Sequence, residues 1–183
     1  MTNHRVGAAL GALAMGIAVL PAGAAVAQSG NSPAGAAAVQ CNKNHKYTFR
    51  TPGDNYTYVY LNVKGGSRKG ATVITWPWAG GKGNETWCLT PGPNGYGWNL
   101  RPWDNKNLCL DVPKGRYKKG QELIVWNCNK GKNQVFSIIQ THTDTNYLLM
   151  SPWYGNGLKI HRGKYDGSPV SLWSHQNRHS MWF

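Results

Sequence analysis

Asp111 and Trp126 could together recognise a ligand that carries both hydroxyl groups and an apolar face. A carboxylate accepts short, charge-assisted hydrogen bonds from hydroxyl groups, and a flat indole ring packs against C–H surfaces. Both residues lie in the segment 107–128, which also contains Cys109 and Cys128. The segment is therefore either a disulfide-bonded structural element that carries an acid, or a binding pocket framed by cysteines. The choice depends on whether the rest of the chain repeats this pattern.

The elements that must position these residues are short β-strands. The chain contains 23 Gly and 10 Pro, and no stretch sustains a helical period. Regular short strands separated by turns predict an all-β sandwich or barrel. The β-rich runs are 56–63, 71–76, 107–112, 121–126, 135–139, 146–150, 157–161 and 169–173.

Three sequence features recur three times in the same order. Each copy has an aliphatic–polar–aliphatic triplet, then a strand that ends in tryptophan, then a polar pair shortly before an aromatic residue. The tryptophans Trp76, Trp126 and Trp173 are separated by 50 and 47 residues. Recurrence at a nearly fixed period indicates a threefold internal repeat. The triplets are 61–63, 110–112 and 158–160, and the closing aromatic residues are Trp87, Phe136 and Trp182.

A unit of about 45 residues built only from short strands cannot bury its own apolar face, so three units must share one core. The aliphatic residues of each triplet point to one face, and the polar residue between them points to the other. Trp87, Phe136 and Trp182 are predicted to converge in the shared core. Asp111, between Leu110 and Val112, is predicted to point away from it.

The middle copy resembles a repeat of the ricin-type lectin family, which implies a β-trefoil of three repeats. The resemblance rests on the motif 109–112 (CLDV), a strand that ends at 126–128 (WNC), and 133–136 (NQVF). Four cysteines alone allow three pairings. The resemblance implies a disulfide between Cys109 and Cys128, which leaves Cys41 to pair with Cys88.

The resemblance also implies sugar-binding residues. In sugar-binding relatives the acid accepts hydrogen bonds from vicinal hydroxyls, and an aromatic residue stacks on the pyranose. An Asn adds a polar contact. The middle repeat keeps Asp111, Trp126, Asn133 and the supporting Gln134, and this is the expected main sugar site. It departs from the pattern at Ile124, where relatives often have Gln.

The first and third repeats keep less of the pattern. The first has Asn62, without charge, in place of the acid, and the expected second sugar site comprises Asn62, Trp76, Asn84 and Glu85. The third repeat is aligned with Lys159 at the position of the acid, and with His179 and Ser180 at the polar pair. Because lysine has only donors, sugar binding in the family manner is not expected there.

The first 40 residues are not expected to belong to the fold. Residues 1–27 combine Arg5, an apolar run and an Ala-Val-Ala site, which predicts a secretory signal peptide. Residues 28–40 are small and of low complexity, which predicts a flexible linker. The lectin domain is expected at 41–183, with repeats at about 41–90, 91–140 and 141–183. Secretion also favours oxidised cysteines, and no membrane span is expected.

The charge of the chain leaves the partner open. There are 20 Lys and Arg against 7 Asp and Glu, which favours anionic partners or simply keeps a secreted protein soluble. The stretch 114–119 places basic residues between Asp111 and Trp126, either as a solvated loop or as a site for an anionic glycan. The alternative function is therefore a basic trefoil interaction protein, such as a toxin-delivery subunit or an inhibitor, that binds an anionic glycan or a protein.

Other classes of function fit the sequence less well. Glycoside hydrolysis usually requires two positioned carboxylates, and the seven acidic residues are scattered, so no catalytic residues are assigned. His175 and His179 have the spacing of a helical metal site but lack a helical apolar face, so no metal or other cofactor is expected. Secretion and the absence of a nucleic-acid motif argue against a nucleic-acid partner.

Overall fold

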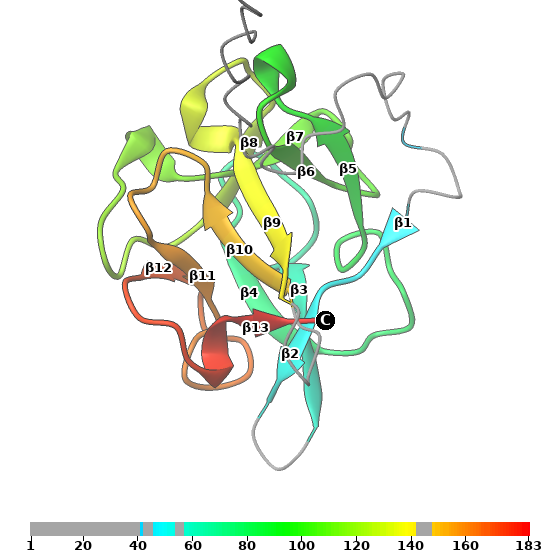
Figure 1. Cartoon of the computed structure of the whole chain (residues 1–183). Helices are drawn as coiled ribbons and strands as arrows, with labels where there is room; N and C mark the ends of the chain where they lie inside the picture. The colour runs from blue at the N-terminus through cyan, green and yellow to red at the C-terminus, as the bar shows by residue number, and fades with distance from the viewer. Residues whose placement is uncertain (1–40, 42–45, 54–56, 142–147) are drawn as a thin grey trace, which may run out of the picture.

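The computed structural model describes residues 41, 46–53, 57–141 and 148–183. The predicted signal peptide and linker, at 1–27 and 28–40, lie outside the described residues. The described part consists of strands, short 3-10 turns and loops (Figure 1). The strands are β1 (Lys46–Tyr47), β2 (Arg50–Pro52), β3 (Tyr58–Val63), β4 (Val73–Pro77), β5 (Trp87–Pro91), β6 (Trp98–Pro102), β7 (Leu108–Asp111), β8 (Ile124–Asn127), β9 (Phe136–Gln140), β10 (Leu148–Pro152), β11 (Lys159–His161), β12 (Ser171–Trp173) and β13 (Met181–Trp182). The 3-10 turns are η2 (Pro93–Gly95), η3 (Pro113–Gly115), η4 (Lys132–Gln134) and η5 (Arg178–Ser180).

Six strands form one antiparallel sheet in the order β1-β5-β6-β9-β10-β13. The pair β9–β10 crosses the middle of the molecule in Figure 1. The C-terminal end of this sheet is tied to β2, because Arg50 and Phe183 exchange backbone hydrogen bonds of 3.1 and 2.8 Å. The N- and C-terminal parts of the fold are therefore held side by side.

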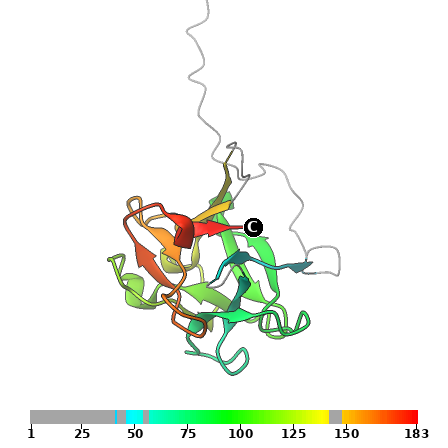
Figure 2. The ribbon, with the colours of Figure 1, turned by 90° about the horizontal axis from the view of Figure 1, so that it is seen from below.

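Three hairpins, β3–β4, β7–β8 and β11–β12, complete the fold. Each hairpin bonds to the next through a ring of backbone hydrogen bonds. Val73 N–H donates to Leu123 O at 2.9 Å, Leu123 N–H donates to Val170 O at 2.9 Å, and Val170 N–H donates to Val73 O at 2.8 Å. We call this closed set the Val73–Leu123–Val170 triangle. A sheet joined to three hairpins in cyclic order confirms the predicted β-trefoil of three repeats, and the strands of the third repeat lie together on one side of Figure 2.

The core lies where the three repeats meet. Trp87, Phe136 and Trp182 have no exposed surface and belong to one buried apolar cluster, as predicted. The two indole groups also donate hydrogen bonds to the backbone: Trp87 Nε1–H donates to Leu61 O at 2.9 Å, and Trp182 Nε1–H donates to Ile160 O at 3.1 Å. The two hydrogen bonds identify Leu61 and Ile160 as equivalent positions.

The register of β11 corrects the sequence alignment of the third repeat. Asp111 lies opposite Ile124, two residues before Trp126, whereas the residue opposite Ser171, two before Trp173, is His161 and not Lys159. The triplet equivalent to 110–112 is therefore 160–162. The predicted placement of Lys159 at the acid position was wrong by two residues.

Both disulfides pair as the resemblance implied. Cys109 and Cys128 join across β7 and the residue after β8, with Cα atoms 5.0 Å apart. Cys41 and Cys88, 5.6 Å apart, join the entry of the chain to β5. In the Cys109–Cys128 disulfide, Cys109 lies two residues before Asp111 on one strand, and Cys128 lies two residues after Trp126 at the end of the other. The disulfide therefore fixes the distance between the two strands that carry these residues.

Candidate functional site

The middle repeat forms a pocket of about 370 Å³ between β7, β8 and the loop before β9. Asp111 reaches it from the end of β7, and Trp126, 40% exposed, from β8. Asn133 lines it from η4. Three of the four residues predicted for the main sugar site therefore share one cavity. Its full lining is Asp111, Pro113, Lys114, Ile124, Trp126, Asn129 and Asn133.

Gln134, the fourth predicted residue, lies behind the pocket and is fully buried. Its Nε2–H group donates to Asp111 Oδ2 at 2.7 Å and to the carbonyl of Asn127 at 3.0 Å. Its Oε1 accepts the backbone N–H of Asn129 at 2.8 Å. Gln134 is therefore a positioning residue that ties the acid, the end of β8 and the following loop together.

Asp111 is only 2% exposed, so its charge depends on the groups around it. Its Oδ2 atom accepts from Asn133 Nδ2 at 2.9 Å as well as from Gln134. Burial raises the pKa of Asp111 above its ordinary value, and the two amide donors counteract part of that shift. Both hydrogen bonds described for the carboxylate end on Oδ2. The other oxygen, Oδ1, is thus the acceptor that a ligand can use.

The loop between β8 and β9 is shaped by a glycine. A Cβ atom on Gly131 would lie 2.5 Å from the Oδ1 atoms of both Asn129 and Asn133, two residues that line the pocket. Such a contact is too close to be accommodated without movement of both side chains. Gly131 therefore allows the two asparagines to approach each other at the edge of the pocket.

The pocket tryptophans of the second and third repeats are each contacted by a lysine from the preceding repeat. The ammonium group of Lys69 lies 4.3 Å from the ring centroid of Trp126, and that of Lys119 lies 4.1 Å from the ring of Trp173. A cation close to an indole ring is attracted by the negative face of the ring. These contacts hold the rings in place across the boundaries between repeats.

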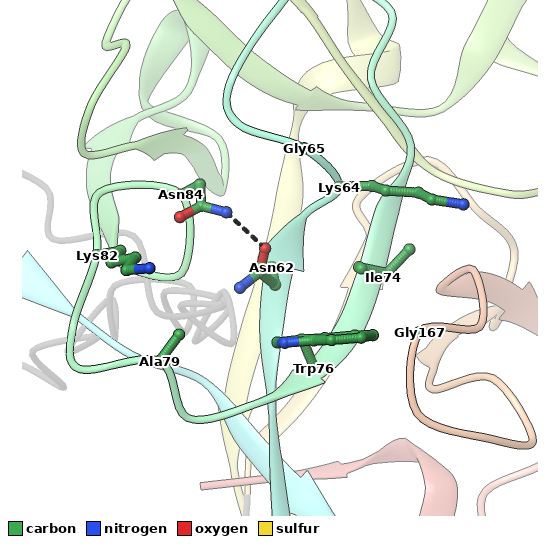
Figure 3. A pocket seen from close by; sticks show the side chains of 9 residues that line it. All are labelled: Asn62, Lys64, Gly65, Ile74, Trp76, Ala79, Lys82, Asn84 and Gly167. Atoms are coloured by element: carbon green, nitrogen blue, oxygen red, sulfur yellow. Dashed lines mark hydrogen bonds between the residues drawn. The ribbon is translucent and has the colours of Figure 1, made fainter.

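The first repeat forms an equivalent pocket of about 360 Å³ (Figure 3). Asn62 and Trp76 project into it from β3 and β4, and Asn84 Nδ2–H donates to Asn62 Oδ1 at 2.8 Å. Gly167, from the third repeat, lies beside the ring of Trp76 with a φ of +81°. A Cβ atom there would come within 3.0 Å of the ring. Three residues predicted for the second sugar site therefore meet in one cavity.

Glu85, the fourth residue predicted for this second site, is fully buried and does not line the pocket. Its carboxylate accepts the backbone N–H groups of Ala79, Gly81 and Lys82. It occupies the position of Gln134 in the second repeat. An acid at this position holds the loop that follows β4 but has no N–H group to donate to Asn62.

Two pocket residues were not found by sequence reasoning. Pro113 and Asn129 line the middle pocket, although neither belongs to the triplet, the tryptophan or the polar pair. Lys114, from the basic stretch 114–119 that was expected near the main site, lines it as well. Lys114 has a φ of +56°, and Asn94 and Asn156 have the same left-handed backbone at the other turns of this kind. Pro113 and Asn129 lie outside the strands, where the sequence pattern carries no signal for the direction of a side chain.

The chain matches the family model of the ricin-type β-trefoil lectin domain over residues 53–182. The chain therefore belongs to this family of lectin domains. A search of curated protein sequences finds no match.

Solved structures of the same fold are similar at low sequence identity. The designed threefold-symmetric protein ThreeFoil is 22% identical with a TM-score of 0.64, covering 75% of this chain and 96% of ThreeFoil. The ricin B-like lectin of Macrolepiota procera in complex with lactose is 19% identical with a TM-score of 0.59, covering 78% and 96%. An exo-β-1,3-galactanase of Clostridium thermocellum is 21% identical with a TM-score of 0.62, but this chain covers only 29% of it. At these identities the structures show a shared fold.

Two further findings bear on partners. Within the described part of the chain, no helix has the length and apolar character needed to span a bilayer. Among the same residues, no group of three or more His, Cys, Asp or Glu side chains is arranged to hold a metal ion.

Proposed function

We propose that this protein is a secreted, non-enzymatic lectin whose main sugar site is the pocket of the middle repeat. Asp111, Trp126 and Asn133 contact the sugar, and Gln134 positions Asp111. The observation that carries this proposal is the placement of a buried carboxylate, held by two amide donors, in one pocket with an exposed indole ring. The family to which the chain belongs supports carbohydrate as the ligand.

The residues divide the task of recognition by their chemistry. Asp111 Oδ1 accepts hydrogen bonds from ring hydroxyls, which are strengthened by its charge. Trp126 offers a flat apolar surface to the C–H face of the pyranose. Asn133 bonds to Asp111 through Nδ2, so its amide oxygen is placed to accept from a further hydroxyl. A few convergent polar groups beside one aromatic surface suffice to orient a ligand.

The lack of a second acid in this pocket supports a binding function over hydrolysis. Most glycoside hydrolases place two carboxyl groups about 5 to 9.5 Å apart across the scissile bond. Asp111 is the one acidic residue among the described residues that line the middle pocket. Secretion is supported by the two disulfides, which persist in oxidising compartments.

A binding experiment with matched tryptophan variants tests the site. The wild type is screened on a glycan array, and the best ligand, together with lactose, is titrated calorimetrically. Trp126→Ala is expected to weaken binding about tenfold or more through the loss of stacking. Trp78→Ala removes a ring of similar exposure, 50%, that lines none of the described pockets, and is expected to leave affinity unchanged.

An isosteric variant tests the acid separately. Asp111→Asn keeps the size of the side chain but removes its charge, and is expected to lower affinity about tenfold, as for a charge-assisted bond. Unchanged affinity in both Asp111→Asn and Trp126→Ala contradicts the assignment of the site. The absence of any glycan ligand for the wild type contradicts the proposed function itself.

The first pocket is proposed as a second, weaker sugar site. Asn62 occupies the place of Asp111 and bonds to Asn84, as Asp111 bonds to Asn133. It lacks the charge, so its hydrogen bonds to a sugar are weaker. Trp76, 47% exposed, supplies the stacking surface.

A second candidate function is favoured by the charge of the chain. An excess of 20 basic over 7 acidic residues suits a partner that is an anionic polymer or an acidic protein. This alternative is supported if the protein binds heparin, loses that binding as the salt concentration is raised, and has no neutral glycan ligand. Binding to a neutral sugar that persists at high salt supports the lectin.

A further inference from the structure

The first pocket adjoins a second cavity that is lined by basic residues. This cavity has a volume of about 410 Å³ and is formed by the loop between β3 and β4. Lys64 and Gly65 line both cavities, so the two are contiguous. We call the joined surface the basic groove. Its basic side chains are Lys64, Arg68, Lys69 and Lys82.

Two lysines give the first pocket a positive charge. Lys82 and Lys64 are exposed and lie on either side of Asn62 in Figure 3. Asn62 stands where the middle repeat has Asp111, and the first pocket has no acid among its lining residues. Because like charges repel and unlike charges attract, an anionic sugar is disfavoured beside Asp111 and favoured in the first pocket.

Arg68 and Lys69 extend the positive charge along the loop. The guanidinium group of Arg68 lies beside Gly65, which lines both cavities, because a Cβ atom on Gly65 would be 3.5 Å from Arg68 Nη2. The ammonium group of Lys69 is 4.3 Å from the ring centroid of Trp126, although Lys69 does not line the middle pocket. The basic side chains therefore follow one another from the first pocket to the border of the middle repeat.

Hydrogen bonds to other parts of the fold hold the loop that carries these two residues. Asn105 Nδ2–H donates to Ser67 O at 3.2 Å, and Gly70 N–H donates to Val125 O at 2.8 Å. The two residues between these anchored positions are the basic ones. Groups held in place before binding lose less conformational freedom when a ligand arrives. The loop therefore presents its charges from a fixed backbone.

The acidic residues that adjoin the groove do not line it. Glu85 is buried, and its carboxylate accepts three backbone N–H groups. Asp104 lies next to Gly83, where a Cβ atom would collide with it, and Asp166 precedes Gly167; both acids are exposed. The lining of the groove itself therefore carries positive charge alone.

We infer that the basic groove binds an acidic polysaccharide that carries carboxylate or sulfate groups on successive sugars. One sugar packs on Trp76 and bonds to Asn62, and the anionic groups of this sugar and its neighbours pair with Lys82, Lys64 and Arg68. The inference deepens the proposed function and rests on it, because it assumes that the first pocket receives a sugar. A continuous row of cations suits a polymer better than a single acidic sugar.

The two parts of the groove select different features of this polymer. The first pocket offers the paired amides of Asn62 and Asn84, joined at 2.8 Å, beside the indole ring of Trp76. These groups suit ring hydroxyls and a C–H face. The loop cavity has no aromatic residue in its lining, whereas single-stranded nucleic acids are usually bound by stacking of successive bases on aromatic side chains. The groove therefore favours a polysaccharide over a nucleic acid.

A length series of acidic and neutral oligosaccharides tests the inference. The monomer, trimer and hexamer of galacturonic acid are compared with their methyl esters, which keep the sugar chain but lack its charge. Each is titrated into 15N-labelled protein while the assigned indole N–H signals of Trp76 and Trp126 are followed. The acidic hexamer is expected to shift the Trp76 signal at lower concentration than its ester or the acidic monomer. Added salt is expected to weaken its binding.

Charge-matched variants locate the anionic groups. Arg68→Gln is expected to weaken binding of the acidic hexamer about two- to fivefold, as for an exposed ion pair. Arg116→Gln makes the same change at an exposed arginine that lines none of the described pockets, and is expected to have no effect. Lys64→Gln tests the junction of the two cavities in the same way, with the exposed Lys130→Gln as its control. All four residues are exposed, so the variants are expected to fold.

The outcomes separate this inference from the proposed function. Equal affinities for the acidic hexamer and its ester, or for the acidic hexamer and monomer, overturn the inference, as do equal responses of Arg68→Gln and Arg116→Gln. If it is overturned while a neutral sugar shifts Trp126, the main site stands. If the acidic hexamer shifts Trp76 and depends on Arg68 while no neutral sugar shifts Trp126, the inference stands and the main site is wrong. Tighter binding of a single-stranded oligothymidylate of equal charge overturns the choice of a polysaccharide.

Discussion

Gln134 Nε2 donates a 2.7 Å hydrogen bond to Asp111 Oδ2, which joins the end of one strand to a turn 23 residues further along the chain. Both side chains are almost completely buried. The amide also bonds to the carbonyl of Asn127 and the N–H of Asn129. One side chain thus fixes the acid and the two segments that border the middle pocket.

Gln134→Glu is expected to destabilise the protein by about 2 kcal/mol or more. The variant loses the donors to Asp111 and to the carbonyl of Asn127 and places a second carboxylate beside the first. The free energy of unfolding in urea measures the effect. Gln140→Glu, at an exposed position, is the control and is expected to change stability by less than about 0.5 kcal/mol.

Glu85→Gln is expected to destabilise the first repeat, although the change makes it resemble the second. The carboxylate of Glu85 accepts from three backbone N–H groups, and an amide has a single oxygen to offer them. The expected cost is about 1 to 3 kcal/mol in urea denaturation. Glu122→Gln, at an exposed residue, controls for the change in net charge. Equal stabilities of the two variants contradict a structural role for Glu85.

Sugar binding at the middle pocket is expected to weaken on acidification, at a higher pH than for an ordinary aspartate. The ligand needs the carboxylate form, and burial raises the pKa of Asp111 above 3.8. Affinity is therefore complete above the raised pKa and is lost as the pH falls through it. Calorimetric titration between pH 7 and pH 4 measures this loss.

The raised pKa of Asp111 also affects the stability of the fold. Sugar affinity is expected to rise with pH, whereas the contribution of Asp111 to stability is expected to fall. The folded protein retains the proton on Asp111 to a higher pH than the unfolded chain does, so ionisation of this group costs folding free energy. Stability relative to Asp111→Asn is expected to be greatest below pH 3.8 and to decline as the pH rises through the raised pKa. Urea denaturation of both proteins from pH 3 to pH 7 tests this. A difference in stability that does not vary with pH contradicts the shift.

Removal of the Cys109–Cys128 disulfide is expected to affect both stability and binding. It closes a loop with a sequence separation of 19 residues, and replacement of both cysteines by serine is expected to cost about 3 kcal/mol. Sugar affinity is expected to fall as well, because Asp111 and Trp126 each lie two residues from a cysteine. The pair Cys41 and Cys88 provides the comparison, since its loss is expected to reduce the melting temperature with little effect on affinity. Affinity that survives removal of the first disulfide contradicts its role in the pocket.

The fold could be predicted from the sequence because its repeats are visible. Nearly constant spacing of Trp76, Trp126 and Trp173 identifies three units, and units of this size must share a core. Trp87 and Trp182, buried at equivalent places, follow from the same comparison. The regularity arises because each repeat must meet its neighbours with the same geometry.

The register of the third repeat could not be predicted in the same way. A strand has a period of two, so a shift of two residues leaves every side chain on its original face. The triplet 158–160 keeps the aliphatic pattern, whereas the true equivalent, 160–162, ends in Arg162. The alternation of aliphatic and polar residues therefore favoured Lys159 over His161 as the equivalent of Asp111. The hydrogen bond from Trp182 to the carbonyl of Ile160 resolves the choice, and it depends on tertiary contacts.

The sequence predicted three residues that share the middle pocket, but it did not predict which side chains would be buried behind the pockets. Asp111, Trp126 and Asn133 follow from the motif, and they meet in one cavity. The burial of Gln134 and Glu85 depends on how the loops fold back over the strands. Lys114 and Asn129 reach the pocket from turns, where no periodicity reveals the direction of a side chain.

The Val73–Leu123–Val170 triangle bears on how the chain folds as it leaves the ribosome. Each side of the triangle needs two hairpins, and the third hairpin is the last to be synthesised. The first two repeats can form one of its three hydrogen bonds, and their apolar faces remain open until Val170 has emerged. Folding is therefore expected to be completed after synthesis is nearly finished, and a chain that ends before β12 lacks the piece that closes the core.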